Sequence, residues 1–309
     1  MRILRYPSAR PVTGTALTLG NFDGVHLGHR AMLSLLHRSA REQSLRPCVM
    51  TFEPHPREFF APDQAPARLT SLREKLELLA LLQVECAYVQ RFDFDFARIT
   101  AEQFVERVLV GDLNVRWLLV GDDFRFGARR QGDIGMLRDA GLARGFEVAQ
   151  MESVTVDGIR VSSTAVRERL GQGDLAGAAR LLGRPYSITG RVVSGDGLGR
   201  QLGFPTANVQ MKHNRPALFG IFVVEVSGCG PATLPGVASL GTRPTVKQAG
   251  TAVLEVHLFD FTGDLYGKHL QVRFLDKLRD EETYSDLETL KLQIGRDAES
   301  ARAYFKAKH

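Results

Sequence analysis

The sequence of 309 residues predicts an α/β domain with a parallel sheet, followed by a smaller antiparallel β domain. Three observations support this. Residues 1–183 alternate short apolar runs with helical segments, whereas residues 184–309 hold β-branched or alternating runs separated by Gly, Pro and Asn. Gly183-Arg184-Pro185 breaks a helix between the two regions. The length also exceeds the size at which one hydrophobic core usually stops growing. The predicted domains are therefore 1–183 and 184–309.

The first domain contains short apolar runs that are typical of buried strands. Two helices between them are expected to open with capping boxes, at Ser71 and Thr100, because Glu or Gln follows three residues later. Strands that alternate with helices indicate βαβ units and a parallel sheet. The predicted strands are 16–19, 48–52, 87–89 and 117–120.

Three loops in this domain follow predicted strands directly. Ligands of parallel sheets bind beyond the carboxyl ends of the strands. We therefore expect residues 20–29, 51–56 and 121–127 to meet at one edge of the sheet.

The second domain shows strand patterns with no predicted helix between them, which is typical of an antiparallel barrel or sandwich. A short helix is expected before it, from Asp174 to about Leu182. A last capping box at Ser285 predicts a long helix through Tyr304 that packs on the side of the β domain. The predicted strands are 188–193, 221–226, 252–258 and 270–274.

Composition favours a protein of the cytoplasm. The net charge of +5 is spread along the chain, which fits either mild attraction for anionic ligands or ordinary surface charge. Cys48, Cys86 and Cys229 lie far apart and form no Cys-x-x-Cys pair, so we expect reduced thiols. The N-terminus lacks an apolar signal core, and no apolar stretch approaches the roughly 20 residues that span a bilayer. No membrane association and no obligatory protein partner are expected.

Residues 20–29, with the sequence GNFDGVHLGH, predict a phosphate site. They follow a strand and open a helix at about Gly28, which places His26 and His29 at a helix N-terminus, where backbone N–H groups attract anions. No Walker A motif occurs in the chain. Imidazole N–H groups there are suited to neutralise charge on a leaving pyrophosphate. Asp23 has turn chemistry alone as an alternative role.

Residues 195–208, with the sequence GDGLGRQLGFPTAN, form a second candidate. Alternating glycines allow the backbone to approach phosphate oxygens, although a glycine-rich loop alone is more often a flexible hairpin. Thr206 and Asn208 stand two residues apart in predicted extended chain, so their side chains point the same way. They are able to offer a hydroxyl and an amide oxygen to one Mg²⁺.

The first motif resembles the Gly-x-Phe-Asp-Gly-x-His-x-Gly-His motif of HxGH nucleotidyltransferases, which have a Rossmann-like fold. Residues 161–167, VSSTAVR, resemble the second signature of that superfamily. Ser163 and Thr164 would lie at another helix N-terminus, with Arg167 reaching the β- and γ-phosphates. The resemblance implies an ATP site made of Gly20, Phe22, Asp23, Gly24, His26, Gly28, His29, Arg160, Ser163, Thr164 and Arg167.

Two more loops resemble those of prokaryotic FAD synthetases, a branch of the same superfamily. Residues 51–56, TFEPHP, resemble the loop that receives FMN, and residues 120–127, VGDDFRFG, resemble the segment beside the isoalloxazine ring. Some relatives carry Asn at the position of Asp123, so a structural role in the turn is an alternative for it. The resemblance implies FMN contacts from His55, Pro56, Asp123 and Phe124.

Residues 203–208, GFPTAN, resemble the signature of riboflavin kinases, whose fold is a six-stranded antiparallel β-barrel. Residues 254–260, LEVHLFD, resemble the strand that carries their catalytic glutamate, which would make Glu255 the general base for the ribityl 5′-hydroxyl. A Glu that faces solvent is the alternative on pattern alone. The implied ATP and flavin contacts are Gly195, Gly197, Gly199, Gly203, Pro205, Thr206, Asn208 and Arg279, with Thr206 and Asn208 as metal ligands.

Together these resemblances cover nearly the whole chain and imply a bifunctional enzyme of flavin cofactor biosynthesis. The C-terminal barrel would convert riboflavin and ATP to FMN, and the N-terminal domain would transfer AMP from ATP to FMN, giving FAD and pyrophosphate. Both steps would need Mg²⁺. One alternative is that the first domain modifies a different phosphate, with the barrel as a regulatory domain. A nucleic-acid binder is a weaker one, because no aromatic residues interleave with a basic stripe.

Overall fold

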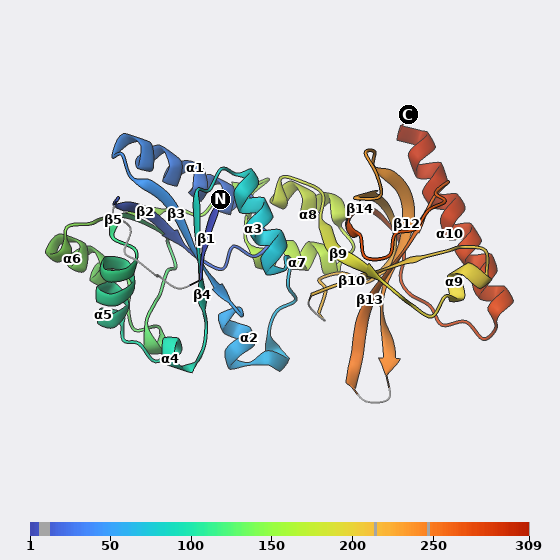
Figure 1. Ribbon diagram of the computed structural model, residues 1–309, viewed down its shortest axis with the longest axis horizontal. Coiled ribbons are helices and arrows are strands. Elements are labelled where there is room, and N and C mark those ends of the chain that lie inside the picture. Colours follow the sequence, from blue (N-terminus) through green and yellow to red (C-terminus); the bar gives the residue numbers. More distant parts are fainter. Residues whose placement is uncertain (6–12, 213–214, 246–247, 309) are drawn as a thin grey trace. The chain divides into compact units, whose positions relative to one another are not determined.

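The computed structural model describes residues 1–5, 13–212, 215–245 and 248–308, which form two compact units (Figure 1). The first unit comprises Met1–Pro66 and Leu72–Ser162, and the second comprises Ala67–Ser71 and Ser163–His309. The domain boundary expected at Gly183 stays a prediction. Within the described residues, no helix is long and apolar enough to cross a membrane.

The first unit is built on a six-stranded sheet in which every neighbouring pair is parallel. Its strand order is β1-β4-β3-β2-β5-β6. The α/β class and all the strands expected in this unit are thus confirmed. The strands are β1 (Arg2–Leu4), β2 (Thr15–Leu19), β3 (Arg46–Glu53), β4 (Cys86–Arg91), β5 (Val115–Gly121) and β6 (Glu147–Met151).

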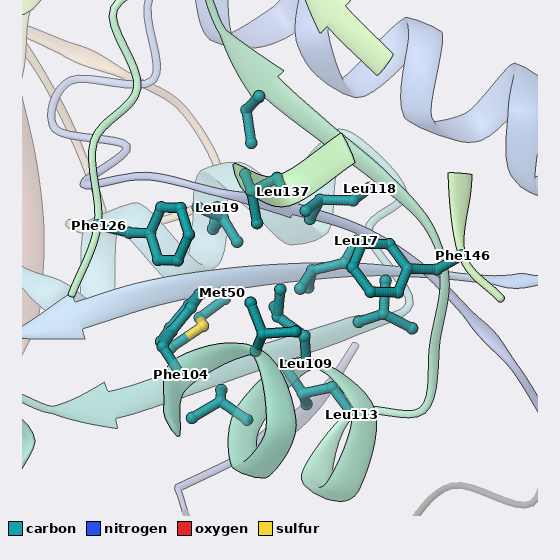
Figure 2. Close-up of a cluster of buried hydrophobic side chains, with 14 of the residues drawn as sticks. Leu17, Leu19, Met50, Phe104, Leu109, Leu113, Leu118, Phe126, Leu137 and Phe146 are labelled. Carbon is teal, nitrogen blue, oxygen red and sulfur yellow. The ribbon is translucent and has the colours of Figure 1, made fainter. Parts of the chain in front are cut away.

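Apolar side chains cover both faces of this sheet, as parallel strands require. Leu17 packs on one face with Phe104 and Leu137, whereas its neighbour Ala16 packs on the other with Leu33. Figure 2 shows the helix that carries Phe104 facing the strands of the first cluster. The helices are α1 (Leu27–Glu42), α2 (Pro56–Phe60), α3 (Leu72–Leu81), α4 (Phe94–Ala97), α5 (Ala101–Gln103), the π-helix η2 (Phe104–Asp112), α6 (Ile134–Arg144), and the 3₁₀ turns η1 (Pro62–Gln64) and η3 (Ala128–Arg130).

The strand order brings the expected ligand loops together. From β2 the chain moves outward to β3 and β4, and β5 then pairs with the opposite side of β2. This reversal is a topological switch point, where α/β sheets bind their ligands. The loops after β3, β2 and β5 are therefore neighbours at the carboxyl edge, as expected.

The helix predicted from Thr100 is confirmed, and it is longer than expected. Both bonds of its capping box are present: Gln103 N donates to Thr100 Oγ1 at 3.2 Å, and Thr100 N donates to Gln103 Oε1 at 2.9 Å. After α5 the backbone widens into η2, which ends at Asp112 instead of about Leu109.

The second unit contains a closed barrel of six antiparallel strands with the order β10-β13-β12-β11-β14-β9, which confirms the barrel over the sandwich. Phe222 and Phe274 meet edge to face inside it, with ring centroids 5.2 Å apart. The strands are β9 (Ser187–Val193), β10 (Ala207–Gln210), β11 (Gly220–Ser227), β12 (Leu234–Thr245), β13 (Gln248–Leu258) and β14 (His269–Arg279). A two-stranded hairpin of the first unit, β7 (Thr155–Val156) and β8 (Ile159–Arg160), is separate from both sheets.

Helices cover the outside of the barrel. α10 (Leu287–Lys308) places Ala298 and Ala301 in one buried cluster with Val223 and Val237, which confirms that it packs on the barrel's side. α7 (Ser163–Gly171) and α8 (Leu175–Leu182) belong to the same unit, where α8 contacts β14. The helix expected to end at about Leu182 is therefore present.

Two expectations for the second unit are wrong. A short helix, α9 (Leu198–Gln201), lies between β9 and β10, where none was expected, and the left-handed backbone of Gly197 leads into it. The cap of α10 is Asp286 and not Ser285, because Thr289 N donates to Asp286 Oδ1 at 2.8 Å. The Ser285 hydroxyl instead donates to the carboxylate of Asp286. That carboxylate accepts the bond because it stands three residues before Thr289.

Candidate functional sites

The turn after β2 is strained where it enters the first candidate site. Phe22, Gly24 and Val25 have positive φ values of 48°, 80° and 42°. Phe22 and Val25 are buried, and packing around them holds a conformation that L-residues rarely adopt, at a cost of about 1–3 kcal/mol each. Such strain is common in ligand-binding turns. Asp23, between them, is also buried.

His26 and His29 form one unit at the N-terminus of α1. His29 N donates to Nδ1 of His26 at 3.3 Å, and the two rings stack with centroids 3.6 Å apart. The ring of Phe22 packs against that of His29, with centroids 4.9 Å apart. A Cβ on Gly28 would lie only 3.1 Å from Nδ1 of His26, so glycine lets the imidazole fold over the first helical turn. Of the predicted ATP-site residues, Phe22, His26, Gly28 and His29 are therefore brought together here.

A buried lysine adds positive charge behind this turn. Lys75 on α3 is 5% exposed, and its Nζ lies 3.4 Å from the hydroxyl of Thr51, which donates to the carbonyl of Asn21 at 3.2 Å. The side-chain Oδ1 of Asn21 is buried without a hydrogen-bond partner among the described residues. Sequence reasoning missed Lys75, because it stands in an amphipathic helix pattern where lysine is normally exposed.

His55 caps the short helix α2. Its Nδ1 accepts a hydrogen bond from Arg57 N at 3.1 Å, and Glu58 Oε2 accepts one from His55 N at 3.2 Å. Pro56 occupies the first position of the helix, where its missing N–H costs nothing. The loop that was expected to receive FMN is thus a fixed turn whose imidazole orientation is set by capping.

Arg160 and Asp123, which were expected to contact different substrates, lie together. Arg160 on β8 places NH2 3.0 Å from Asp122 Oδ1 and 3.5 Å from Asp123 Oδ2. The Ser153 hydroxyl donates to Asp122 Oδ2 at 2.8 Å. Phe124, the next residue, stacks on Phe126 with centroids 5.8 Å apart. The hairpin and the loop after β5 are therefore tied together by ion pairs.

An exposed group of aromatic rings, which we call the phenylalanine cluster, follows the His55 turn. Phe60 and Phe94 are 66% and 67% exposed. The ring centroid of Phe59 lies 5.3 Å from that of Phe60 and 4.8 Å from that of Phe94. Sequence reasoning missed this cluster, although the runs Phe59-Phe60 and Phe92-Asp93-Phe94-Asp95-Phe96 signal it. Its members are Phe52, Phe59, Phe60, Phe92, Phe94 and Phe96.

The second nucleotidyltransferase signature begins a helix, as expected. α7 starts at Ser163, so Ser163 and Thr164 occupy its first turn, and Arg167 follows one turn later. The guanidinium Nε of Arg167 donates to the carbonyl of Ala67 at 2.5 Å. All these residues belong to the second compact unit.

The barrel carries a pocket of about 390 Å³ on its outer face. Thr206 and Glu255 both line it, together with Gly197 and Gly199 of the glycine-rich loop. Pocket residues that were not predicted as site residues include Ser239, His257, Glu281, Tyr284 and Asp297.

The orientation of Glu255 follows from strand register. On β13, Leu254 and Val256 are buried in the barrel, whereas Glu255 is half-buried and points to the pocket side. Glu255 pairs with Asn208 on β10 and with Ser239 on β12. Directly opposed residues on neighbouring strands share a face. The carboxylate and the Asn208 amide therefore lie on the same outer surface.

Two glycines of the loop give the metal-ligand candidates their room. A Cβ on Gly195 would collide with the amide of Asn208, and one on Gly199 would lie 2.5 Å from the carbonyl of Phe204 and 3.1 Å from the hydroxyl of Thr206. Gly203 has a φ of 91°, which favours glycine. The loop thus passes directly over the side chains of Thr206 and Asn208.

Two further contacts fix the pocket walls. His257 Nδ1 lies 2.9 Å from the carbonyl of Pro205, which fastens the Gly-Phe-Pro-Thr segment to β13. Arg279, at the end of β14, pairs with Asp297 of α10, and NH2 lies 2.7 Å from Oδ2. Hydrogen bonding to that carboxylate raises the pKa of Arg279. Arg279 lines the pocket, as its expected flavin contact requires.

The first unit has a histidine-capped helix at the switch point of a parallel sheet, and the second has a barrel pocket that holds a glycine loop and a carboxylate. These features define an enzyme with two phosphate-transfer sites. The family model of FAD synthetase matches residues 9–165, and that of riboflavin kinase matches residues 182–305. The chain belongs to the family of bifunctional riboflavin kinases/FMN adenylyltransferases. The expected order of the two parts is confirmed.

Individual relatives agree over almost the full length. The chain is 51% identical to the bifunctional riboflavin kinase/FMN adenylyltransferase of Escherichia coli (strain K12), covering 96% of this chain and 95% of the relative. It is 43% identical to that of Haemophilus influenzae, covering 99% and 100%. A crystal structure described as a macrolide-efflux protein from Streptococcus pneumoniae is 27% identical, with a TM-score of 0.81 over 97% of this chain and 98% of the other.

Proposed function

We propose that the barrel pocket phosphorylates riboflavin at its 5′-hydroxyl and that the carboxyl edge of the first sheet adenylylates the resulting FMN. The observation that carries the first assignment is the pocket itself, in which Glu255 and Thr206 face one space beneath the glycine loop. The second assignment rests on the paired histidines at the N-terminus of α1.

In the kinase step, Glu255 is the general base. Its carboxylate takes the proton of the ribityl 5′-hydroxyl while that oxygen bonds to the γ-phosphorus of ATP and the bond to the β-phosphate oxygen breaks, so that ADP leaves. The glycine loop offers backbone close to the phosphates, and Gly195, Gly197, Gly199 and Gly203 belong to this role. Pro205 holds the start of the loop's exit strand through His257.

The donor set at and beside this pocket suits Mg²⁺, because Thr206 lines the pocket and Asn208 pairs with Glu255 of its wall. Thr206 and Asn208 offer a hydroxyl and an amide oxygen, which are the hard donors that Mg²⁺ prefers. The described residues contain no group of three or more His, Cys, Asp or Glu that would cage a metal. This fits an ion that is shared with nucleotide phosphates. When bound, Mg²⁺ neutralises charge on those phosphates.

In the adenylylation step, the FMN phosphate is the nucleophile. Its oxygen bonds to the α-phosphorus of ATP, and the bond to the β-phosphate oxygen breaks, so that pyrophosphate leaves and no protein nucleophile is needed. The imidazole N–H groups of His26 and His29 donate hydrogen bonds to the phosphates, aided by the positive end of the α1 dipole. Other ATP contacts fall to Gly20, Phe22, Asp23, Gly24, Gly28, Arg160, Ser163, Thr164 and Arg167.

Flavin recognition at this edge combines an anion contact with an apolar platform. Because Nδ1 of His55 caps α2, the phosphate contact falls to Nε2. Pro56 holds the turn, and Asp123 and Phe124 border the ring from the loop after β5. We add the exposed ring of Phe60 and the half-buried ring of Phe59, which lie one helical turn after His55 and offer faces on which an isoalloxazine ring stacks favourably.

The site of action that we propose is the cytoplasm. All three cysteines are buried and free, which agrees with reduced thiols. Riboflavin, FMN and ATP are the proposed ligands, with FMN and FAD as products.

The test is a flavin chromatogram of the purified protein with riboflavin, ATP and Mg²⁺, repeated with EDTA. We expect FMN first and then FAD, with neither in EDTA. Absence of both flavins would sink the proposal, and conversion of supplied FMN alone would leave only the adenylylation.

The aromatic platform is tested by Phe60→Ala. This change should raise the KM for FMN about tenfold, by analogy with stacking contributions of about 1–3 kcal/mol, with riboflavin phosphorylation unchanged. Leu142→Ala, which also removes an exposed apolar side chain from the first unit, is the control.

A further inference from the structure

We propose that Asp297, on the C-terminal helix α10, is a positioning residue of the riboflavin kinase site, which holds the guanidinium of Arg279 in the orientation that meets the flavin. The inference rests on the proposed flavin contact of Arg279. It extends the kinase site to a residue that lies outside the sequence motifs.

The pair has the geometry of a clamp. Arg279 Nε donates to Oδ1 of Asp297 at 2.9 Å, and NH2 donates to Oδ2 at 2.7 Å, so two parallel bonds fix the plane of the guanidinium. The side chains are 19% and 8% exposed. Gln293, one turn earlier on α10, donates to Oδ1 of Asp297 at 2.9 Å. The carboxylate is therefore itself held in place from the helix.

The clamp leaves part of Arg279 available on the pocket wall. A guanidinium has five N–H donors, two of which go to Asp297 and one, from NH1, to the carbonyl of Asp280 at 2.9 Å. The other two have no hydrogen-bond partner among the described residues. Arg279, Asp297 and Tyr284 all line the pocket, and the Tyr284 ring lies 5.9 Å from Cζ of Arg279. The two remaining donors suit the carbonyl oxygens of a planar ring.

Charge balance supports the same role. The carboxylate of Asp297 compensates the positive charge of Arg279, and Glu281 and Glu282 line the same pocket, so this wall presents hydrogen-bond donors without a net positive charge. Such a wall favours an uncharged ring over the phosphates of ATP. Without the carboxylate, the guanidinium would be free to turn toward a phosphate or toward Glu282, whose Oε2 lies 3.9 Å from NH1 of Arg279.

The experiment is steady-state kinetics of full-length Asp297→Asn. We expect the KM for riboflavin to rise about tenfold or more, as for loss of a hydrogen bond to a charged group, while kcat stays within about threefold. The KM for ATP and the conversion of supplied FMN to FAD should not change. An unchanged riboflavin KM in the folded variant overturns the proposal.

A matched control separates positioning from helix docking. Asp260 forms a comparable two-bond pair with Arg302 of the same helix, at 2.9 and 3.0 Å, but it is 80% exposed and lies outside the pocket lining. Asp260→Asn should leave the riboflavin KM unchanged. If it raises that KM as much as Asp297→Asn does, the effect comes from docking of α10 and the proposal fails.

A double-mutant cycle tests whether Asp297 acts through Arg279. In an Arg279→Gln background, Asp297→Asn should change the riboflavin KM no further, and an additive rise overturns the proposal. If Arg279→Gln alone has no effect, the proposed flavin contact is wrong. If only Arg279→Gln raises KM, the contact stands and the positioning role is wrong.

A milder variant keeps the test decisive where Asp297→Asn does not fold. Gln293→Met removes only the bond to Oδ1, and we expect a rise of about two- to fivefold in the riboflavin KM. That rise must also disappear in the Arg279→Gln background. A rise that persists there counts against the proposal.

Discussion

The backbone N–H of His29 donates to Nδ1 of His26, and the two imidazole rings stack with centroids 3.6 Å apart. An accepting Nδ1 carries no proton, so a neutral His26 has its proton on Nε2. The ring pair is thus oriented by the first turn of α1 itself. This preorganisation at a helix N-terminus is what stabilisation of a leaving pyrophosphate requires.

Replacement of His29 should separate the two activities. We expect His29→Ala to slow conversion of FMN to FAD by about 10²–10³-fold, the usual loss when one charge-stabilising donor is removed. Phosphorylation of riboflavin should continue at the original rate. Initial rates of the two steps, measured separately by flavin chromatography, check this. Loss of both activities in a folded variant would contradict independent sites.

Gly28→Ala should weaken adenylylation without a change of charge. The added Cβ would lie 3.1 Å from Nδ1 of His26 and 3.2 Å from its Cε1, so the imidazole must tilt. We expect a fall of about tenfold or more in kcat, because small misplacements of charge-stabilising groups are costly. Gly171→Ala is the control, since a Cβ there meets no atom within 4 Å. Equal effects of the two substitutions would exclude the steric explanation.

Glu255→Gln tests the opposite site. The amide is nearly isosteric but takes up no proton, so FMN formation should fall by about 10²–10⁴-fold, the range of general-base contributions. FAD formation from supplied FMN should persist. Radioactive or chromatographic detection of FMN is sensitive enough for this range, and a variant with near-normal kinase rate would remove Glu255 from the mechanism.

The glycine loop offers a steric test in the same pocket. A Cβ on Gly199 would press on the Phe204 carbonyl and the Thr206 hydroxyl. We expect Gly199→Ala to lower kcat/KM for ATP in the kinase step by about tenfold, because the loop can no longer close on Thr206. Gly230→Ala, in the same unit but with open space around it, should behave as the wild type. A normal Gly199→Ala enzyme would mean that the loop does not hold phosphate.

Asp174 should make the stability of α8 depend on pH. Its carboxylate accepts a hydrogen bond from Gly177 N at 2.7 Å and a second from Arg169, and the first of these is the main reason that its pKa is lowered. A depressed carboxyl pKa gives stability that is present above the unfolded value of about 3.9 and is lost as the pH falls through the folded value.

Loss of this cap through Asp174→Ala should therefore cost about 1 kcal/mol at pH 7. The difference from the wild type should shrink below a pH of about 4. Urea unfolding of both proteins at pH 7 and at pH 3.5 measures this difference in the free energy of unfolding. A constant difference across that range would show that the carboxylate's charge is irrelevant.

The sequence predicted the parts whose signal is local. Apolar runs such as 48–52 identified strands because both faces of a parallel sheet are buried. The capping pair of Thr100 and Gln103 was readable because both partners lie within one turn. β12 was missed because Pro235 and Gly236 obscure its strand pattern.

Long-range contacts account for what remained unpredicted in the candidate sites. Lys75 and Asp297 look like exposed positions of amphipathic helices, and only the tertiary structure buries them. The pairing of Asn208 with Glu255 depends on barrel register, which no local pattern encodes. Asp286 displaced Ser285 as the cap of α10 because either residue type can cap, and backbone geometry decides.

The rings of Phe222 and Phe274 fill the lumen of the barrel, so its ligand pocket lies on the outer wall. Alternate residues of β13 therefore have different roles. Leu254 and Val256 face inward and stabilise the barrel, whereas Glu255 and His257 face the pocket. Outward positions that have no assigned role in the reaction, such as Ser239 and Val253, are therefore open to redesign for modified flavins, because they line the pocket and lie outside the lumen of the barrel.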